Sequence, residues 1–154
     1  MRLLGSRPPC RTRRFPGVHG LPDGVTAAGG HRLLISYEAT TPSLFSLRGA
    51  AQGPCDIVWV LDSSEPEMAE AARLLSRMGT VMDMSGCSPA QTVEALRATG
   101  PTGVVALNDR RINLLAEVAE GLELDFHTPE AARRLSDKML QRQAMEALGP
   151  PSAP

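Results

Sequence analysis

The chain of 154 residues has little lysine, few aromatic side chains and no long hydrophobic run. Aromatic residues make up only 3% of it, so we expect a core of leucine, valine, alanine and methionine and no stacking platform for single-stranded nucleic acid. No apolar stretch is long enough to cross a bilayer, which argues against a membrane protein. The three cysteines, Cys10, Cys55 and Cys87, are too scattered for a disulfide framework or a zinc site, so a cytoplasmic location is expected.

The net charge of −1 conceals an uneven distribution of charged residues. Residues 1–30 hold five arginines and one aspartate, whereas residues 31–154 hold eleven cationic and sixteen acidic residues. The acidic balance of the longer part argues against a nucleic-acid partner. Residues 1–30 are also rich in proline and glycine, and we expect them to form a disordered extension. Arg13-Arg14 is not an export signal, because Pro16 and Gly17 follow where an apolar segment is needed.

Strand-like and helix-like patterns alternate between residues 31 and 127. Short apolar runs predict four strands, at residues 33–37, 57–61, 81–84 and 103–107. The second run is apolar at every position, as in strands that are buried on both faces of a sheet. Helical patterns follow the runs, with starts expected at Pro42, Ser64, Ser88 and residue 110. The alternation predicts an α/β fold, a Rossmann-like open parallel sheet of about four strands with helices on both faces.

Local signals predict where several helices begin and end. Ser64 to Glu67 and Ser88 to Gln91 both have the spacing of a capping box. Asn108-Asp109 is expected to cap the helix over residues 110–122, which leaves Arg110 and Arg111 on a solvated face.

Residues 128–154 break the alternation with two successive helical stretches. Thr128-Pro129 supplies the cap and first-turn residues of the first stretch, and Gly149 ends the second before a proline-rich tail. We therefore expect three parts: a disordered extension at 1–30, an α/β domain at 31–127 and a helical linker at 128–154.

Ligands of open parallel sheets bind beyond the carboxyl ends of the strands, and Asp62 lies at such an end. A ribose contact in a dinucleotide-binding fold is one role for Asp62, but no G-x-G-x-x-G motif occurs, so a turn residue is the favoured interpretation. Cys87 has His31 and His127 elsewhere in the chain, but nothing in the sequence places either histidine beside it. No acidic pair stands at metal-ligand spacing, so no metal site is expected.

Residues 101–154 carry an ordered set of short motifs. These are residues 114–122, then His127-Thr128-Pro129, then Asp137-Lys138, then Ala147-Leu148-Gly149 with its prolines. In this order and spacing they resemble the junction between the amino-terminal domain and the nucleotide-binding part of ATP-grasp ligases. Three residues depart from the family pattern: Glu123 and Asp125, where glycine and proline are frequent, and Pro150, where a branched aliphatic residue is common.

The resemblance implies a role for the one lysine of the chain, Lys138. In the family the lysine of this aspartate–lysine pair lies near the nucleotide, so Lys138 is expected to face the ATP phosphates at the ligand-binding rim, and Asp137 to orient the helix start. Lysine suits a single phosphate oxygen because it is a compact charge on a flexible stem. A surface lysine is the alternative interpretation.

The resemblance also implies an activity and its requirements. ATP-grasp ligases use ATP and Mg²⁺ to convert a carboxylate into an acyl phosphate, which an amine or similar nucleophile then attacks. Their glycine-rich loop and magnesium ligands lie beyond the position where this sequence stops, so we expect an amino-terminal fragment without turnover or tightly bound cofactor of its own. Family members are often homodimers, which the sequence leaves open here. The alternative is a stand-alone, flavodoxin-like small-ligand or regulatory module without catalysis.

Overall fold

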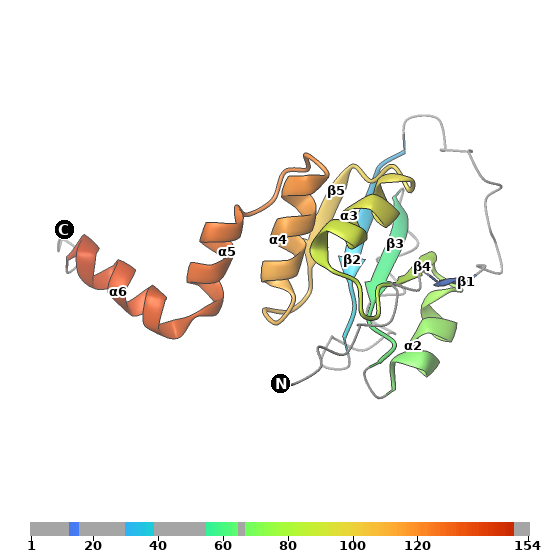
Figure 1. Ribbon diagram of the computed structural model, residues 1–154, viewed down its shortest axis with the longest axis horizontal. Helices are drawn as coiled ribbons and strands as arrows, with labels where there is room; N and C mark the ends of the chain where they lie inside the picture. The colour runs from blue at the N-terminus through green and yellow to red at the C-terminus, as the bar shows by residue number, and fades with distance from the viewer. Residues whose placement is uncertain (1–12, 16–29, 39–54, 65–66, 150–154) are drawn as a thin grey trace, which may run out of the picture.

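The computed structural model describes residues 13–15, 30–38, 55–64 and 67–149 (Figure 1). Its elements, in chain order, are β1 (Arg13–Phe15), β2 (Arg32–Ser36), β3 (Asp56–Leu61), α2 (Met68–Leu75), β4 (Thr80–Asp83), α3 (Pro89–Arg97), β5 (Gly103–Ala106), α4 (Ile112–Gly121), α5 (Pro129–Ser136) and α6 (Lys138–Leu148). The helix expected to start at Pro42 lies outside the described residues. Within the described part of the chain, no helix has the length and apolar character that a membrane span requires.

The strands form one sheet in the order β1-β4-β3-β2-β5. The four strands from β2 to β5 are parallel, which confirms the expected open parallel sheet. Strand β5 pairs with β2, so the chain crosses from one edge of the parallel strands to the other after β4. Read as first to fourth strand, the order is third-second-first-fourth, as in Rossmann folds, and differs from the flavodoxin order named in the alternative interpretation.

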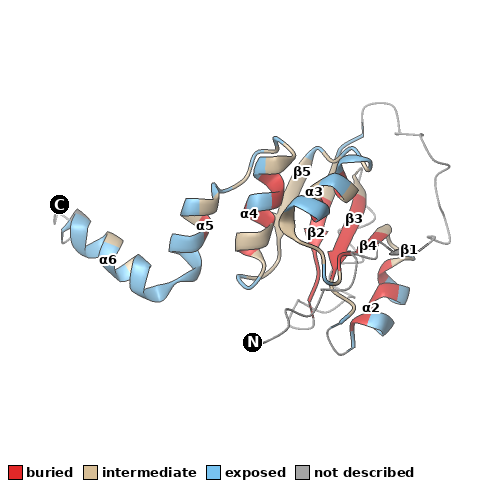
Figure 2. Cartoon of the chain, viewed as in Figure 1, coloured by how far each residue is buried: buried red, intermediate tan, exposed pale blue. Residues whose placement is uncertain are grey.

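Helices cover both faces of the sheet, as the alternation of patterns predicted. Strand β3 divides its side chains between the two faces: Ile57 and Trp59 belong to the cluster that packs under α2, and Val58 and Val60 belong to the cluster under α3 and α4. Both residues 57 and 58 are buried because each face has its own helical layer, and the central strand β3 is coloured as buried in Figure 2. This is why the β3 sequence is apolar at consecutive positions.

Three expectations about where secondary structure forms or begins are wrong in the described residues. Arg13–Phe15 lies inside the segment expected to be disordered, but it forms strand β1 and pairs antiparallel with β4. Without β1, the outer edge of β4 would have unpaired backbone groups. The helix expected at Ser64 begins at Met68, and its N-cap, Glu67, makes no side-chain capping bond. The capping box predicted at Ser88 is present. The Ser88 hydroxyl accepts a hydrogen bond from the Gln91 amide, and the Gln91 side chain accepts one from the Ser88 amide.

The third correction concerns the start of α4. Its N-cap is Arg111, with no side-chain capping bond, so Asn108-Asp109 does not cap this helix as expected. Arg110 is exposed as predicted, but Arg111 is not part of a solvated face, because its guanidinium turns toward the end of β2.

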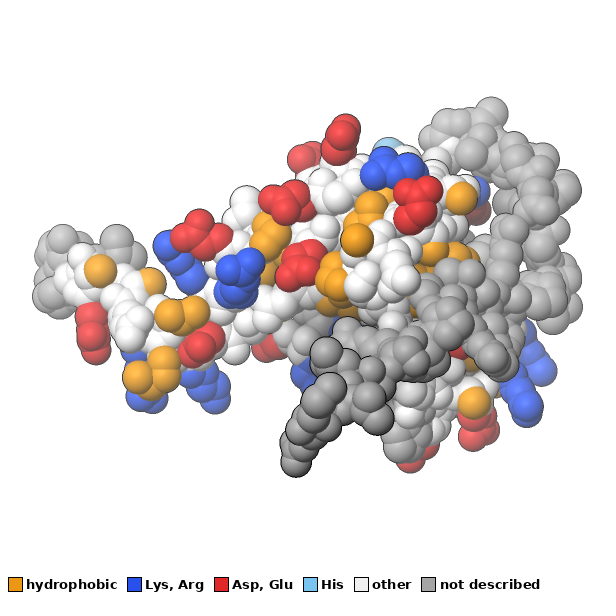
Figure 3. Space-filling model, in the orientation of Figure 1, with side chains coloured by type: hydrophobic (Ala, Val, Ile, Leu, Met, Phe, Trp, Pro, Cys, Tyr) orange, Lys and Arg blue, Asp and Glu red, His pale blue; other side chains and the backbone are white. Residues whose placement is uncertain are grey.

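The two last helices differ in how they pack. Ala132 of α5 is fully buried against Ile112 and Ala116 of α4, and the side chains of Asn113 and Ser136 are hydrogen-bonded at 2.9 Å. Helix α6 extends from α5 away from the sheet (Figure 1). Apolar side chains are visible on its surface in Figure 3, and Met139 and Met145 are 59% and 70% exposed.

Candidate functional site

The candidate site lies at the carboxyl ends of β2, β3 and β4, between these strand ends and helices α3 and α4. A cavity of about 270 Å³ opens there. Its lining includes Ser36 at the end of β2, Asp62 after β3, Thr92 and Leu96 from α3, and Arg111, Leu114, Leu115 and Val118 from the start and body of α4. This edge is where parallel α/β sheets bind ligands, because the strand order reverses beside β2.

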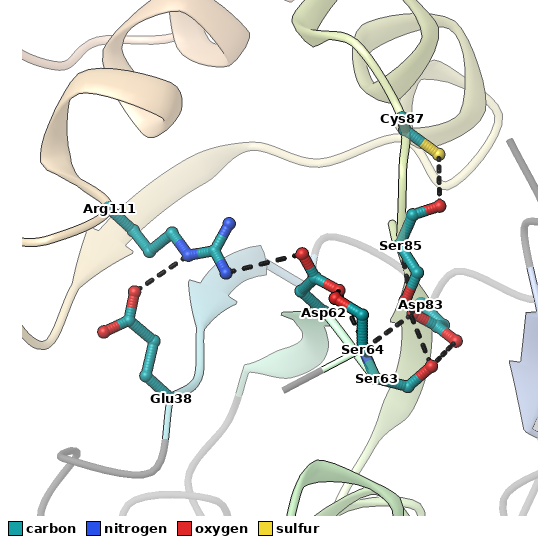
Figure 4. A network of polar contacts seen from close by, with 8 residues as sticks. All are labelled: Glu38, Asp62, Ser63, Ser64, Asp83, Ser85, Cys87 and Arg111. Atoms are coloured by element: carbon teal, nitrogen blue, oxygen red, sulfur yellow. Dashed lines mark hydrogen bonds and ion pairs between the residues drawn. The ribbon is translucent and has the colours of Figure 1, made fainter. Parts of the chain in front are cut away.

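An ion-pair bridge spans the edge of the cavity. Arg111 Nε donates to Glu38 Oε1 at 2.8 Å, and Arg111 Nη2 lies 3.7 Å from Asp62 Oδ2 (Figure 4). The Glu38 side chain is only 2% exposed, whereas Arg111 and Asp62 keep 24% and 23% of their side-chain surface. One guanidinium thus ties the end of β2 to the end of β3, and the bridge is open to solvent at Arg111 and Asp62 but not at Glu38.

A second polar network surrounds Asp83, the last residue of β4. Its carboxylate accepts hydrogen bonds from the amide of Ser63 at 3.1 Å and the hydroxyl of Ser63 at 2.6 Å, and from the amide of Ser85 at 3.1 Å. The Ser85 hydroxyl also donates to it. Asp83 is 2% exposed, so these bonds replace the water that a free carboxylate would bind. The loops after β3 and β4 are therefore fixed to one another.

Both aspartates are held in the ionised form by their surroundings. Burial by itself raises the pKa of Asp62, but hydrogen bonds from Ser64 and Ser85, together with the positive charge of Arg111, outweigh burial, and its pKa lies below the ordinary value. Burial likewise raises the pKa of Asp83, and the hydrogen bonds from Ser63 and Ser85 outweigh it, so this pKa is also lowered. Asp62 also accepts from the Ser64 amide at 3.0 Å, which confirms its role in a turn.

The cavity changes character from its mouth to its floor. Leu96, Leu115 and Val118 are at most 1% exposed and form an apolar base, whereas Asp62 and Arg111 form a charged mouth. An apolar cavity with a few convergent polar groups is the usual form of a small-ligand site.

The residues singled out in the sequence do not all meet at this cavity. Lys138 is exposed and is the first residue of α6, which packs against α5 and lies away from the sheet, so it does not face the ligand-binding rim as expected (Figure 1). Asp137 has the expected orienting role, because its carboxylate accepts from the amides of Met139 and Leu140 at 2.8 and 3.3 Å. Arg111, the central residue of the site, was missed because only the fold brings it to Glu38.

The structure does not bring Cys87 and His31 together. Cys87 follows β4 at the carboxyl edge of the sheet, whereas His31 precedes β2 at the opposite edge. Cys87 is disulfide-bonded and Cys55 is a free cysteine; the spacing of the cysteines did not predict this bond. The Cys87 sulfur lies 3.8 Å from the Ser85 carbonyl oxygen.

No cluster of metal-binding side chains is found among the described residues.

Comparison with known proteins yields one informative likeness. No family model matches the chain, and no curated protein matches it. Among solved structures, it is similar to an L-amino acid ligase from Bacillus licheniformis, with a TM-score of 0.55 and 17% sequence identity. The superposition covers 78% of this chain and 30% of the ligase, so the chain spans about a third of the length of that protein. At this identity the likeness establishes the α/β fold.

Proposed function

We propose that this chain forms the amino-terminal α/β domain of an ATP-grasp ligase. The observation that carries the proposal is the similarity of 78% of the chain to an L-amino acid ligase, together with the motif run over residues 101–154. The parent enzyme would use ATP and Mg²⁺ to form an acyl phosphate from a carboxylate, and an amine would attack it.

The phosphates of ATP are assigned to Lys138 rather than to the rim of the cavity. Glu38, Asp62 and Asp83 gather three carboxylates near one guanidinium at that rim, which repels a triphosphate. Lys138, by contrast, stands four residues before Arg142 on an exposed helix, so two cations share one face. A cation at a helix amino terminus opposes the helix dipole. This placement favours binding of an anion over stability of the helix.

In such an enzyme the described residues would form a domain that supports the catalytic one. They contain no cluster that would hold Mg²⁺, so the metal and the acyl transfer are assigned to a further domain. When bound there, the metal supplies charge stabilisation to the transferred phosphoryl group. The present residues contribute the rigid sheet, the charged cavity and the Lys138 ammonium.

Two experiments test the proposal. The coding DNA beyond codon 154 is expected to continue in frame into a glycine-rich loop and Glu and Asn metal ligands; a stop codon with no such frame nearby would favour the stand-alone module. The purified chain is expected to release no ADP from ATP and Mg²⁺ when supplied with amino acids, and ADP release by this chain alone would show that the catalytic core is not elsewhere.

The role of Lys138 needs its own test in the full ligase. Lys138→Ala is expected to raise the KM for ATP about tenfold, the effect of losing roughly one charge-assisted hydrogen bond. Lys138→Arg would recover part of this loss, and Arg110→Ala serves as a matched removal of an exposed cation. An unchanged KM in Lys138→Ala would assign Lys138 to the surface.

A further inference from the structure

The cavity between α3 and α4 has dimensions suited to a very small molecule. Its volume of about 270 Å³ corresponds to roughly nine water molecules at ~30 Å³ each. This lies just under the range of about 300–1,000 Å³ that is typical of sites for drug-sized ligands. The apolar floor formed by Leu96, Leu115 and Val118 would accept a short aliphatic group.

Ser36 adds a polar group to the wall of this cavity. The residue is 5% exposed and lines the cavity, yet its hydroxyl makes no hydrogen bond to any part of the chain that the structure describes. This oxygen is not among the buried polar atoms that lack a partner, so it is accessible from the cavity and can hydrogen-bond there. A ligand that offers a hydrogen-bonding group near the end of β2 would pair with it.

The charged side chains around the mouth of the cavity determine which sign of charge a ligand would carry. The carboxylates of Glu38, Asp62 and Asp83 lie in the same network as the guanidinium of Arg111. Glu38 already holds Arg111 at 2.8 Å, whereas the contact of Arg111 with Asp62 is longer, at 3.7 Å. Asp62 is therefore a carboxylate that its 3.7 Å contact with Arg111 leaves accessible, and it forms part of the cavity lining.

We propose that this cavity binds a small primary amine in its ammonium form, with a short branched aliphatic tail. The ammonium group donates to Asp62 and to the Ser36 hydroxyl, and the tail rests on Leu96, Leu115 and Val118. The site is distinct from the ATP-phosphate role of Lys138, because α6 lies away from the sheet. The inference goes beyond the proposed ligase function, since it needs neither ATP nor a further domain.

Titration of the full chain with three molecules of equal shape tests the proposal. These are 3-methylbutan-1-amine, 3-methylbutan-1-ol and 3-methylbutanoate, and binding is followed by calorimetry and by the methyl NMR signals of Leu115 and Val118. The amine is expected to bind and to shift these signals, with the alcohol and the carboxylate at least tenfold weaker, because each lacks the charge that Asp62 attracts. Equal binding of the alcohol, absence of amine binding, or shifts confined to other parts of the chain would overturn the proposal.

Two variants locate the head group. Asp62→Asn is expected to weaken amine binding about tenfold or more, whereas Asp125→Asn, an exposed carboxylate outside the cavity lining, leaves it unchanged. Circular dichroism shows whether Asp62→Asn is folded; if it is not, Ser36→Ala, with an expected several-fold loss, takes its place. Unchanged affinity in a folded Asp62→Asn protein contradicts the assignment, whatever the ligase assays show.

Discussion

Arg111 Nε and Glu38 Oε1 lie 2.8 Å apart and join the start of α4 to the end of β2. These residues are far apart in the sequence, and their elements meet because β5 pairs with β2 and delivers α4 to that position. The carboxylate is almost wholly buried, so removing this ion pair is expected to be costly.

We expect Arg111→Met to destabilise the protein by about 3 kcal/mol, because it leaves the buried Glu38 carboxylate without this ion pair. The neighbouring Arg110→Met removes the same side chain from an exposed position and should change stability by less than about 0.5 kcal/mol. Urea unfolding followed by circular dichroism measures both. The double variant Arg111→Met/Glu38→Gln should recover part of the loss, and strictly additive losses would show that the two charges are not coupled.

Asp83 should make stability depend on pH in the acid range. Its folded pKa lies below the ordinary value of 3.8, so its stabilising contribution is fully present above that value and is lost as the pH falls through the lower folded pKa. Asp83→Asn should lower the free energy of unfolding at pH 7 by about 1–3 kcal/mol, since an amide cannot accept all of the hydrogen bonds from Ser63 and Ser85.

The check for Asp83 is the unfolding free energy measured from pH 7 to pH 2. The difference between wild type and Asp83→Asn should shrink below about pH 3.8. The exposed Asp125→Asn substitution provides the control and should follow the wild type throughout. A constant difference over the whole range would show that the charge of Asp83 is not what stabilises the two loops.

Glu123→Gly should stabilise the protein by about 0.5–1 kcal/mol. Glu123 has φ 59, a left-handed conformation that costs an L side chain roughly 1–2 kcal/mol and that glycine adopts freely. The bonds from the amide of Glu123 to Glu120 O and from the amide of Leu124 to Ala119 O form the helix-ending motif in which glycine is usual. Thermal unfolding measures the gain, and Glu120→Gly, inside α4, should instead lose about 1 kcal/mol.

Two adjacent leucines of α2 should respond very differently to truncation. Leu75 is fully buried in the cluster under α2, whereas Leu74 is 41% exposed. Leu75→Ala should cost about 2–5 kcal/mol, and Leu74→Ala less than about 1 kcal/mol. Chemical denaturation compares them under the same conditions; similar losses would mean that α2 does not cover the sheet through the face described.

Local sequence was enough to predict elements whose signals are complete within a few residues. The box from Ser88 to Gln91, the cap at Thr128 and the role of Asp137 are all present. The capping box predicted at Ser64 does not form, because the Ser64 hydroxyl donates to Asp62 and the helix begins only at Met68. A side chain with two possible partners cannot be assigned from spacing alone.

The sequence by itself determined that this chain is an α/β protein with a sheet buried on both faces, because apolar periodicity is a local property that each strand and helix carries. Tertiary structure alone decided the order of the strands, and with it the meeting of Arg111, Glu38 and Asp62. Strand pairing joins residues that are distant along the chain, so the charge and shape of the cavity arise only once the sheet has assembled.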